Sequence, residues 1–128
     1  MPVTWEGDAV TIDATVLTST EAPYELVRQM RASIVVLGPL LARRGAAHVA
    51  PPGGDFPARR TIRTHIEALT AMGARVVEGA GHRLEVPGGL RPASIYLDEA
   101  SVTGTETALL AAAAAPGLSE IRHAACEP

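Results

Sequence analysis

Residues 23–49 read PYELVRQMRASIVVLGPLLARRGAAHV, and this stretch sets the pattern for the rest of the chain. Its apolar residues recur at helical spacing, at Leu26, Met30, Ile34, Leu37 and Leu41. This spacing predicts one helix over residues 23–44, with Pro23 in its first turn and Gly45 at its end. Pro39 is expected to kink this helix or to split off its last turn. Residues 46–49 then predict a short strand.

The same order of helix, glycine and short strand recurs along the chain. The glycines are Gly45, Gly73 and Gly117, and a Pro-Gly-Gly run occurs twice, at residues 52–54 and 87–89. This is a weak internal repeat of α/β units, and it predicts a mixed α/β fold.

Further helices and strands are predicted from capping and alternation. Thr64 with Glu67, and Thr103 with Glu106, have the spacing of capping boxes, so each pair is expected to start a helix. Alternating apolar residues and turn residues predict hairpins over residues 3–12 and 75–86, and strands over residues 94–97 and 119–123.

Composition excludes several classes of protein. The 128 residues amount to one domain, and no apolar run is long enough to cross a bilayer. A net charge of −3 and 3% aromatic residues argue against nucleic-acid binding. The start of the chain lacks the layout of a signal peptide, so we expect a cytoplasmic protein. Cys126 is alone and the four histidines lack metal-ligand spacing, so neither a disulfide nor a metal site is expected.

Residues 51–60, PPGGDFPARR, form the segment best suited to chemistry. Two glycines leave the backbone unconstrained, and Asp55 is followed within five residues by Arg59 and Arg60. A carboxyl group that donates a proton, beside guanidinium groups that bind phosphate, suits a phosphate-bearing substrate. The alternative is an ordinary surface turn.

The chain resembles the UDP-N-acetylglucosamine enolpyruvyl transferases, which are 1-carboxyvinyltransferases related to EPSP synthase. The resemblance covers nearly the whole chain from about Gly7. It is carried by the order and spacing of APYELVRQMRAS at 22–33, the loop at 51–60, PGGLR at 87–91 and SVTGTE at 101–106. It implies βαβαββ units of an inside-out α/β barrel, three to a domain. Residues 1–128 would then be a single partial domain, less than a third of a typical member.

The resemblance also implies a reaction. Members transfer an enolpyruvyl group from phosphoenolpyruvate to the 3′-hydroxyl of UDP-N-acetylglucosamine, without a metal or an organic cofactor. The reaction belongs to peptidoglycan synthesis, and so to cell wall biogenesis, cell shape and cell division in the cytoplasm. The expected partners are these two small molecules, and neither nucleic acid nor membrane.

Matching the motifs residue by residue implies roles for three side chains. Asp55 stands where the family has the acid that protonates the methylene carbon of phosphoenolpyruvate. Arg31 and Arg60 match arginines that bind its phosphate and carboxylate. No acidic residue lies one helical turn from Arg31, which also favours a binding role over a surface ion pair.

Two further segments match the nucleotide-binding motifs. Thr61, Ile62, Arg63 and Thr64 follow Arg60 in the stretch that contacts uracil, but Arg63 replaces the family's acid. Ser101, Val102 and Thr103 match the residues that hold the diphosphate at a helix N-terminus, although a helix cap explains Thr103 fully and Ser101 in part. Before this motif, Glu99 stands where some members have lysine, and its charge would repel a diphosphate.

Two interpretations follow. In the first, the chain is part of a working transferase and is inactive alone, because the family's Lys-Asn pair and the groups of a second domain are missing from it. In the second, it is a non-catalytic protein that binds a nucleotide sugar or associates with itself through exposed sheet edges. The departures at Arg63, Glu99 and residues 56–57 favour the second.

Overall fold

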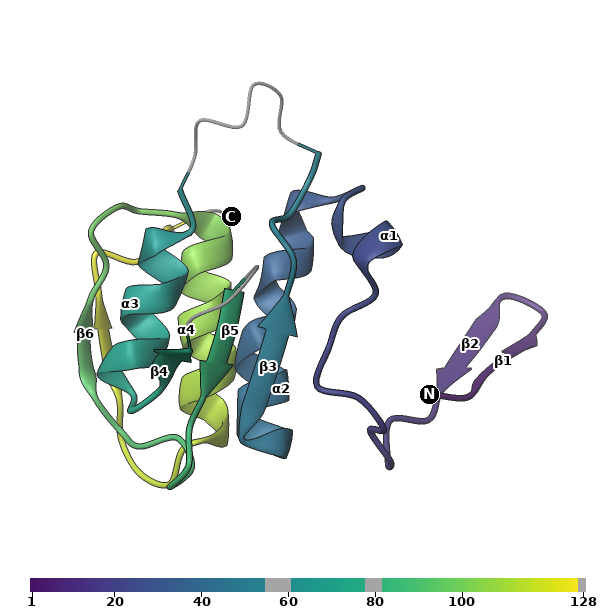
Figure 1. Ribbon diagram of the computed structural model, residues 1–128, viewed down its shortest axis with the longest axis horizontal. Coiled ribbons are helices and arrows are strands. Elements are labelled where there is room, and N and C mark those ends of the chain that lie inside the picture. The colour runs from purple at the N-terminus through teal and green to yellow at the C-terminus, as the bar shows by residue number, and fades with distance from the viewer. Residues whose placement is uncertain (55–60, 78–81, 127–128) are drawn as a thin grey trace.

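The structure, a computed structural model, describes residues 1–54, 61–77 and 82–126 (Figure 1). Its elements in chain order are β1 (Val3–Glu6), β2 (Ala9–Ile12), α1 (Tyr24–Val27), the 3₁₀-helix η1 (Arg31–Val36), α2 (Leu37–Arg44), β3 (Ala46–Val49), α3 (Arg63–Ala71), β4 (Arg75–Val77), β5 (His82–Glu85), β6 (Ser94–Tyr96), α4 (Val102–Ala114) and β7 (Glu120–Arg122). Helices and strands alternate along most of the chain, as the α/β prediction requires.

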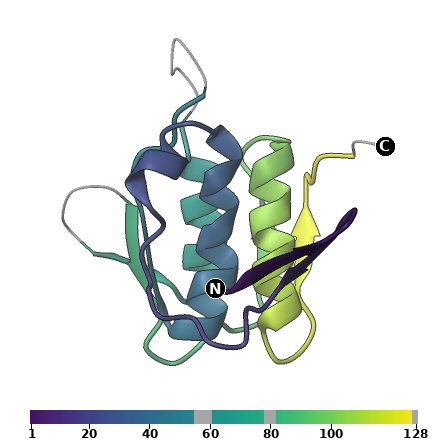
Figure 2. The same ribbon diagram turned by 90° about the vertical axis from the view of Figure 1, so that its right-hand side faces the viewer.

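Three helices form the centre of the fold. Helix α4 packs against both α2 and α3, and two small sheets cover different sides of the three helices (Figures 1 and 2). One sheet has the antiparallel order β3-β5-β4, and the other pairs β6 with β7 in parallel. None of the helices in the described ranges is long and apolar enough to cross a membrane.

The core lies between these helices and the inner faces of the sheets. Its fully buried side chains include Ile34, Leu37 and Leu41, as the helical spacing predicts. Leu69 enters it from α3, and Met72 from the residue directly after α3. In the three-stranded sheet the inward residues Ala47, Val49 and Leu84 complete it.

The prediction of one helix over residues 23–44 is wrong. The chain forms α1, leaves the helix at Met30, where φ is −145°, and then continues through η1 into α2. This break rotates the apolar stripe, so Leu26 and Met30 are 62% and 58% exposed. Pro39 does not kink α2, because it lies in the first turn of this helix. The N–H groups of a first turn have no acceptor within the helix, so a proline there removes no helical hydrogen bond. The αL conformation of Gly45 does end the helix, as predicted.

The two predicted capping boxes are also wrong. Helix α3 begins at Arg63 without a side-chain cap, and Thr64 donates its hydroxyl hydrogen bond to Asp98 instead. Helix α4 is capped by Ser101, whose Oγ accepts from the Gly104 N–H at 3.2 Å. Both predicted hairpins, and strands within residues 94–97 and 119–123, are confirmed.

A short extended segment, residues 20–22, widens the three-stranded sheet. The Ala22 N–H donates to the His48 carbonyl at 3.1 Å, and the His48 N–H donates to the Thr20 carbonyl at 2.8 Å. Residues 20–22 therefore run parallel to β3 on the side away from β5, with Glu21 as the bridge partner of His48. Helix α2 connects these two parallel segments, just as α4 connects β6 and β7.

Candidate functional site

Two depressions meet at Arg31, and together they hold most of the predicted substrate-binding residues that the structure describes. The first has a volume of about 630 Å³ and the second about 580 Å³. The first is lined by Arg31, Pro51, Pro52, Thr61, Ile62, Arg63, Ile66, Glu67 and His82. The second is lined by Arg31, Ala32, Glu99, Ala100, Ser101, Val102 and Thr103. The fold thus places residues 61–63 and 101–103 in two depressions that share one arginine.

Arg31 is positioned by the turn that breaks the predicted helix. It is the first residue of η1, and its Nη2 donates to the carbonyl oxygen of Thr61 at 2.9 Å. This contact joins η1 to the segment that enters α3. The guanidinium group therefore lies beside Thr61, which lines the first depression, and Arg31 also lines the second.

Gly53 and Gly54, the two glycines of the segment 51–60, pack against this turn. The Gly53 N–H donates to the Val27 carbonyl at 3.1 Å, and a Cβ on Gly53 would overlap the carbonyl oxygen of Arg28. Gly54 has φ of +81° and lies against the backbone of residues 29–31. Asp55 and Arg60, the predicted acid and second phosphate ligand, lie outside the described residues.

Arg63 is held by two acidic side chains. Its Nε lies 2.5 Å from Glu67 Oε1 and 3.8 Å from Asp98 Oδ2. Its hydrogen bond to Glu67, with the charges of Glu67 and Asp98, raises the pKa of the guanidinium. Thr64 is 1% exposed and faces Asp98, so its side chain does not line either depression. Sequence reasoning missed Asp98, although an acid directly after a predicted strand and before a helix was a signal for it.

His65 connects α3 to the start of α4. It is 1% exposed, its Nδ1 lies 2.9 Å from Thr107 Oγ1, and its Nε2 lies 3.2 Å from Thr103 Oγ1. Burial, followed by the positive charge of Arg31, lowers the pKa of His65 to about 4. The neutral ring thus fixes Thr103, which lines the second depression. Its position one turn before Leu69 on the apolar face of α3 was the sequence signal for this burial.

We expect the stability of the fold to fall between pH 6.5 and pH 4 because of His65. The unfolded chain binds a proton near the ordinary pKa of 6.5, while the folded chain remains neutral at this residue down to about 4. At pH 4.5 the loss amounts to about 2 to 3 kcal/mol, at about 1.4 kcal/mol per pKa unit. Urea unfolding at pH 7 and pH 4.5 measures it, and His65→Gln, which lacks the titrating group, should show a smaller fall. An equal fall in both proteins would contradict this origin.

The N-terminus of α4 faces the second depression through residues 101–103. Unpaired N–H groups in the first turn of a helix attract anions. Glu99 lines the same depression and opposes that attraction. The second depression can therefore bind a phosphate group only if the attraction by the positive charge of Arg31 exceeds the repulsion by the Glu99 carboxylate.

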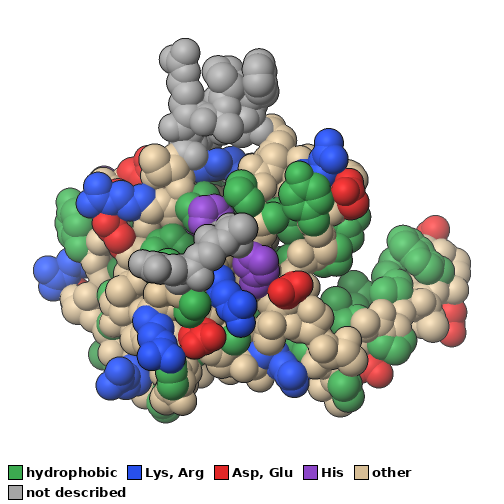
Figure 3. Space-filling view, in the orientation of Figure 1, with side chains coloured by type: hydrophobic (Ala, Val, Ile, Leu, Met, Phe, Trp, Pro, Cys, Tyr) green, Lys and Arg blue, Asp and Glu red, His purple; other side chains and the backbone are tan. Residues whose placement is uncertain are grey.

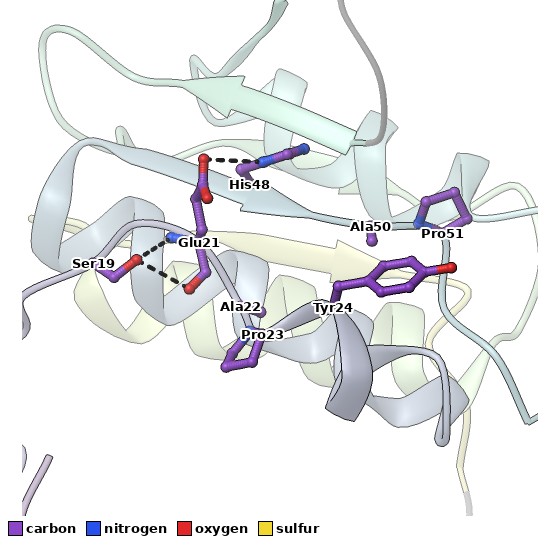
Figure 4. Close-up of a pocket in the computed structure, with 8 residues that line it drawn as sticks. All are labelled: Ser19, Glu21, Ala22, Pro23, Tyr24, His48, Ala50 and Pro51. Carbon is purple, nitrogen blue, oxygen red and sulfur yellow. Dashed lines mark hydrogen bonds and ion pairs between the residues drawn. The ribbon is translucent and has the colours of Figure 1, made fainter.

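A third depression, of about 600 Å³, lies beside the Glu21–His48 pair (Figure 4). Its lining comes from Tyr24 of α1, from residues 19–23 and from residues 48–51, and it contains none of the predicted site residues. Within the described ranges, no three His, Cys, Asp or Glu side chains are grouped as metal ligands. The depressions around Arg31 are therefore the candidate site.

The chain is similar in sequence to known carboxyvinyltransferases. The family model for EPSP synthase (3-phosphoshikimate 1-carboxyvinyltransferase) matches residues 2–128. The UDP-N-acetylglucosamine 1-carboxyvinyltransferase of a Nitratiruptor species is 48% identical over 125 residues, which are 97% of this chain and 30% of that protein. The protein of the same name from Desulfosudis oleivorans is 50% identical over 123 residues, 96% of this chain and 30% of that protein.

A solved structure shows the same fold. The enolpyruvyl transferase NikO from Streptomyces tendae superimposes with a TM-score of 0.72 at 19% identity, over 95% of this chain and 29% of that one. The chain thus spans about 30% of the length of the relatives that it matches. By its sequence and its fold, the chain belongs to the EPSP synthase family of carboxyvinyltransferases.

Proposed function

We propose that this chain is the partial domain, residues 1–128, of an enzyme that transfers an enolpyruvyl group from phosphoenolpyruvate to UDP-N-acetylglucosamine. The observation that carries the proposal is the convergence of residues 61–63 and 101–103 on Arg31. The names of the two relatives supply the sugar nucleotide and the group transferred. Peptidoglycan synthesis in the cytoplasm, with its consequences for cell shape and division, is the cellular role that follows.

The reaction is an addition followed by an elimination. The 3′-hydroxyl of the sugar adds to C2 of phosphoenolpyruvate while a proton is added to C3, and the tetrahedral product then loses phosphate and the C3 proton. In this proposal Asp55 supplies the C3 proton, and Arg31 and Arg60 bind the phosphate and carboxylate. A guanidinium fork binds both groups through paired hydrogen bonds and stabilises the charge that develops during the addition. The step requires neither a metal nor an organic cofactor.

The sugar nucleotide would lie across both depressions. Thr61, Ile62 and Arg63 would contact the uracil, with Thr64 fixing the start of α3 through Asp98. Ser101, Val102 and Thr103 would face the diphosphate. Because Glu67 and Asp98 hold the Arg63 side chain, the backbone of this segment remains the more suitable partner for uracil.

A non-catalytic binder of nucleotide sugars is the second candidate. It is favoured by Arg63, which cannot accept a proton from the uracil imide, and by Glu99, which repels the diphosphate. In both cases the 128-residue chain alone should be inactive, because the family's site includes groups from a second domain.

Calorimetric titration and a phosphate-release assay test the proposal together. We expect the chain to bind UDP-N-acetylglucosamine more tightly than UMP, because UMP lacks the second phosphate and the N-acetylglucosamine. We also expect the chain to release no phosphate from phosphoenolpyruvate. Binding of neither the sugar nucleotide nor phosphoenolpyruvate would contradict the proposal. Binding of the sugar nucleotide without phosphoenolpyruvate, even when the remaining domains of a relative are added, would favour the non-catalytic candidate.

A further inference from the structure

Asp98 connects the two segments that line the candidate site. It follows β6 closely in the chain, and the next residues, 99–103, line the second depression. Its carboxylate contacts the first turn of α3, where Thr64 donates its hydroxyl hydrogen bond to Oδ1 and the Nε of Arg63 lies 3.8 Å from Oδ2. Residues 61–63, which line the first depression, lead into that turn. A contact across 34 residues of sequence thus joins one depression to the other.

The residue before Asp98 fixes its position. Leu97 is 1% exposed, and its N–H donates to the Arg122 carbonyl at 3.1 Å. The carbonyl of Leu97 accepts a hydrogen bond from Nδ1 of His123 at 2.9 Å. Both backbone groups of Leu97 are therefore bonded to β7 and the residue after it. The carboxylate of Asp98 extends from this fixed point, so its bond to Thr64 holds the start of α3 in place.

Thr64 is the buried partner in this contact. Its side chain packs against the first turn of α4, because a Cβ on Gly104 would lie only 2.9 Å from Thr64 Cγ2. The glycine at 104 therefore allows the starts of α3 and α4 to approach each other closely. Thr64 is 1% exposed, and a buried hydroxyl group is costly unless it has a hydrogen-bond partner. Asp98 supplies that partner.

The ion pair with Arg63 is the weaker of the two contacts that Asp98 makes. The Arg63 side chain is 68% exposed, and its Nε lies closer to Glu67, at 2.5 Å. Charged side chains of both signs are visible over α3 in Figure 3. Exposed ion pairs contribute little, and Glu67 holds Arg63 without help from Asp98. The hydrogen bond from Thr64 is therefore the contact that couples the two segments.

We propose that Asp98 is a positioning residue, which aligns the start of α3 with residues 99–103 so that one ligand contacts both depressions. This inference rests on the proposed function, in which a sugar nucleotide lies across both. Asp98 itself is not among the described residues that line either depression. Its negative charge also repels an anionic ligand, so its contribution to binding comes from the alignment. A ligand that contacts one depression alone does not need this alignment.

Glu99, the next residue, is a matched control. Both side chains carry a negative charge near the second depression, but Glu99 lines that depression whereas Asp98 holds Thr64. Removing the charge of Glu99 should therefore strengthen the binding of an anionic ligand, while removing the Asp98 carboxylate should weaken it. Asp98→Asn retains an oxygen that accepts from Thr64, so this variant should bind at least as tightly as the parent chain.

Calorimetric titration of the 128-residue chain with UDP-N-acetylglucosamine and with UMP tests the proposal. Asp98→Ala should weaken the binding of the sugar nucleotide about 10-fold, as expected for a lost hydrogen bond to a charged group, and that of UMP by less than about threefold. Glu99→Gln should strengthen the binding of the sugar nucleotide about two- to fivefold, the range for exposed charges.

Two results of this titration would contradict the positioning role. A purely structural role of Asp98 would lower the urea midpoint of unfolding and leave the ratio of the two affinities unchanged in Asp98→Ala. A role through charge alone would make Asp98→Ala bind the sugar nucleotide more tightly, as expected for Glu99→Gln.

Substitutions of Thr64 test the same contact from α3, and they decide the question if Asp98→Ala does not fold. Thr64→Val removes the hydroxyl group and should change the ratio of the two affinities as Asp98→Ala does. Thr64→Ser keeps the hydroxyl group and should keep the parent ratio. In the Asp98→Ala chain, Thr64→Val should have no further effect, because both residues act through one bond. Additive effects would show that they act separately and would overturn the proposal.

Failure of this inference is distinguishable from failure of the proposed function. If the parent chain binds UDP-N-acetylglucosamine and the Asp98 and Thr64 variants keep the parent ratio, the positioning role is wrong and the proposed function stands. If the parent chain binds neither UDP-N-acetylglucosamine nor UMP, both are wrong.

Discussion

Replacing Gly53 by alanine is expected to destabilise the fold and to abolish the proposed binding of UDP-N-acetylglucosamine. The added methyl group would overlap the carbonyl oxygen of Arg28, and the contact is with backbone, which cannot rotate away as a side chain can. The turn over residues 28–31 would have to move, carrying Arg31 away from Thr61. Overpacking of this kind costs about 1 to 3 kcal/mol and displaces backbone. The urea unfolding midpoint and the affinity for UDP-N-acetylglucosamine measure the two effects.

Gly88→Ala is the matched control. A Cβ on Gly88 has no heavy atom within 4 Å, and its φ is not in the left-handed region. This variant should keep the stability and the affinity of the parent chain, or gain up to about 1 kcal/mol from a less flexible unfolded state. Equal behaviour of the two variants would mean that the contact between Gly53 and Arg28 does not position the site.

Arg31→Gln is expected to weaken the binding of phosphoenolpyruvate and of UDP-N-acetylglucosamine by about 10- to 100-fold, since a hydrogen bond to a charged group contributes about 1.5 to 3 kcal/mol. Arg31 is the residue that both depressions share, so one substitution should affect both ligands. Arg31→Lys keeps the charge but loses the fork, and it should restore only part of the affinity. Calorimetric titration of each ligand into each variant gives these ratios.

Arg28→Gln is the control for the lost charge. Arg28 lies three residues earlier, pairs at the surface with Glu25 at 3.4 Å, and lines neither depression. Its substitution should change either affinity by less than about twofold, because exposed ion pairs contribute little. A similar loss in Arg28→Gln and Arg31→Gln would indicate general attraction of anions rather than a site at Arg31.

The local signals in the sequence predicted those parts of the fold that depend on neighbouring residues. Alternation on either side of residues 7–8 and 78–81 predicted both hairpins, and the glycine at position 45 predicted a helix end. The same signals failed where distant contacts decide the structure. Helical spacing continues through Met30, yet the chain leaves the helix there, where Gly53 and Gly54 pack against residues 28–31. Thr64 is drawn to Asp98, 34 residues away, rather than to its own helix.

In the candidate site, too, the sequence predicted contacts between neighbouring residues but not contacts between distant ones. Resemblance to the family indicated Arg31, residues 61–64 and residues 101–103, but only the fold shows that Arg31 lines both depressions. The pairing of Arg63 with Glu67 could be predicted from its i, i+4 spacing. The place of Asp98 directly after a predicted strand was a signal for a functional acid, but only the fold shows that this acid reaches Arg63. The link from His65 to Thr103 joins two helices and has no local signature.

Mapping amide chemical shifts during titration with UDP-N-acetylglucosamine tests the central claim most directly, because it locates the ligand on the folded chain. We predict saturable shifts at Arg31, Thr61 and residues 101–104, and none in the β1–β2 hairpin. We also predict that Arg31→Gln moves the transition to higher ligand concentration. Saturable shifts confined to the depression beside Glu21 and His48, or none at any concentration, would contradict the assignment of the site.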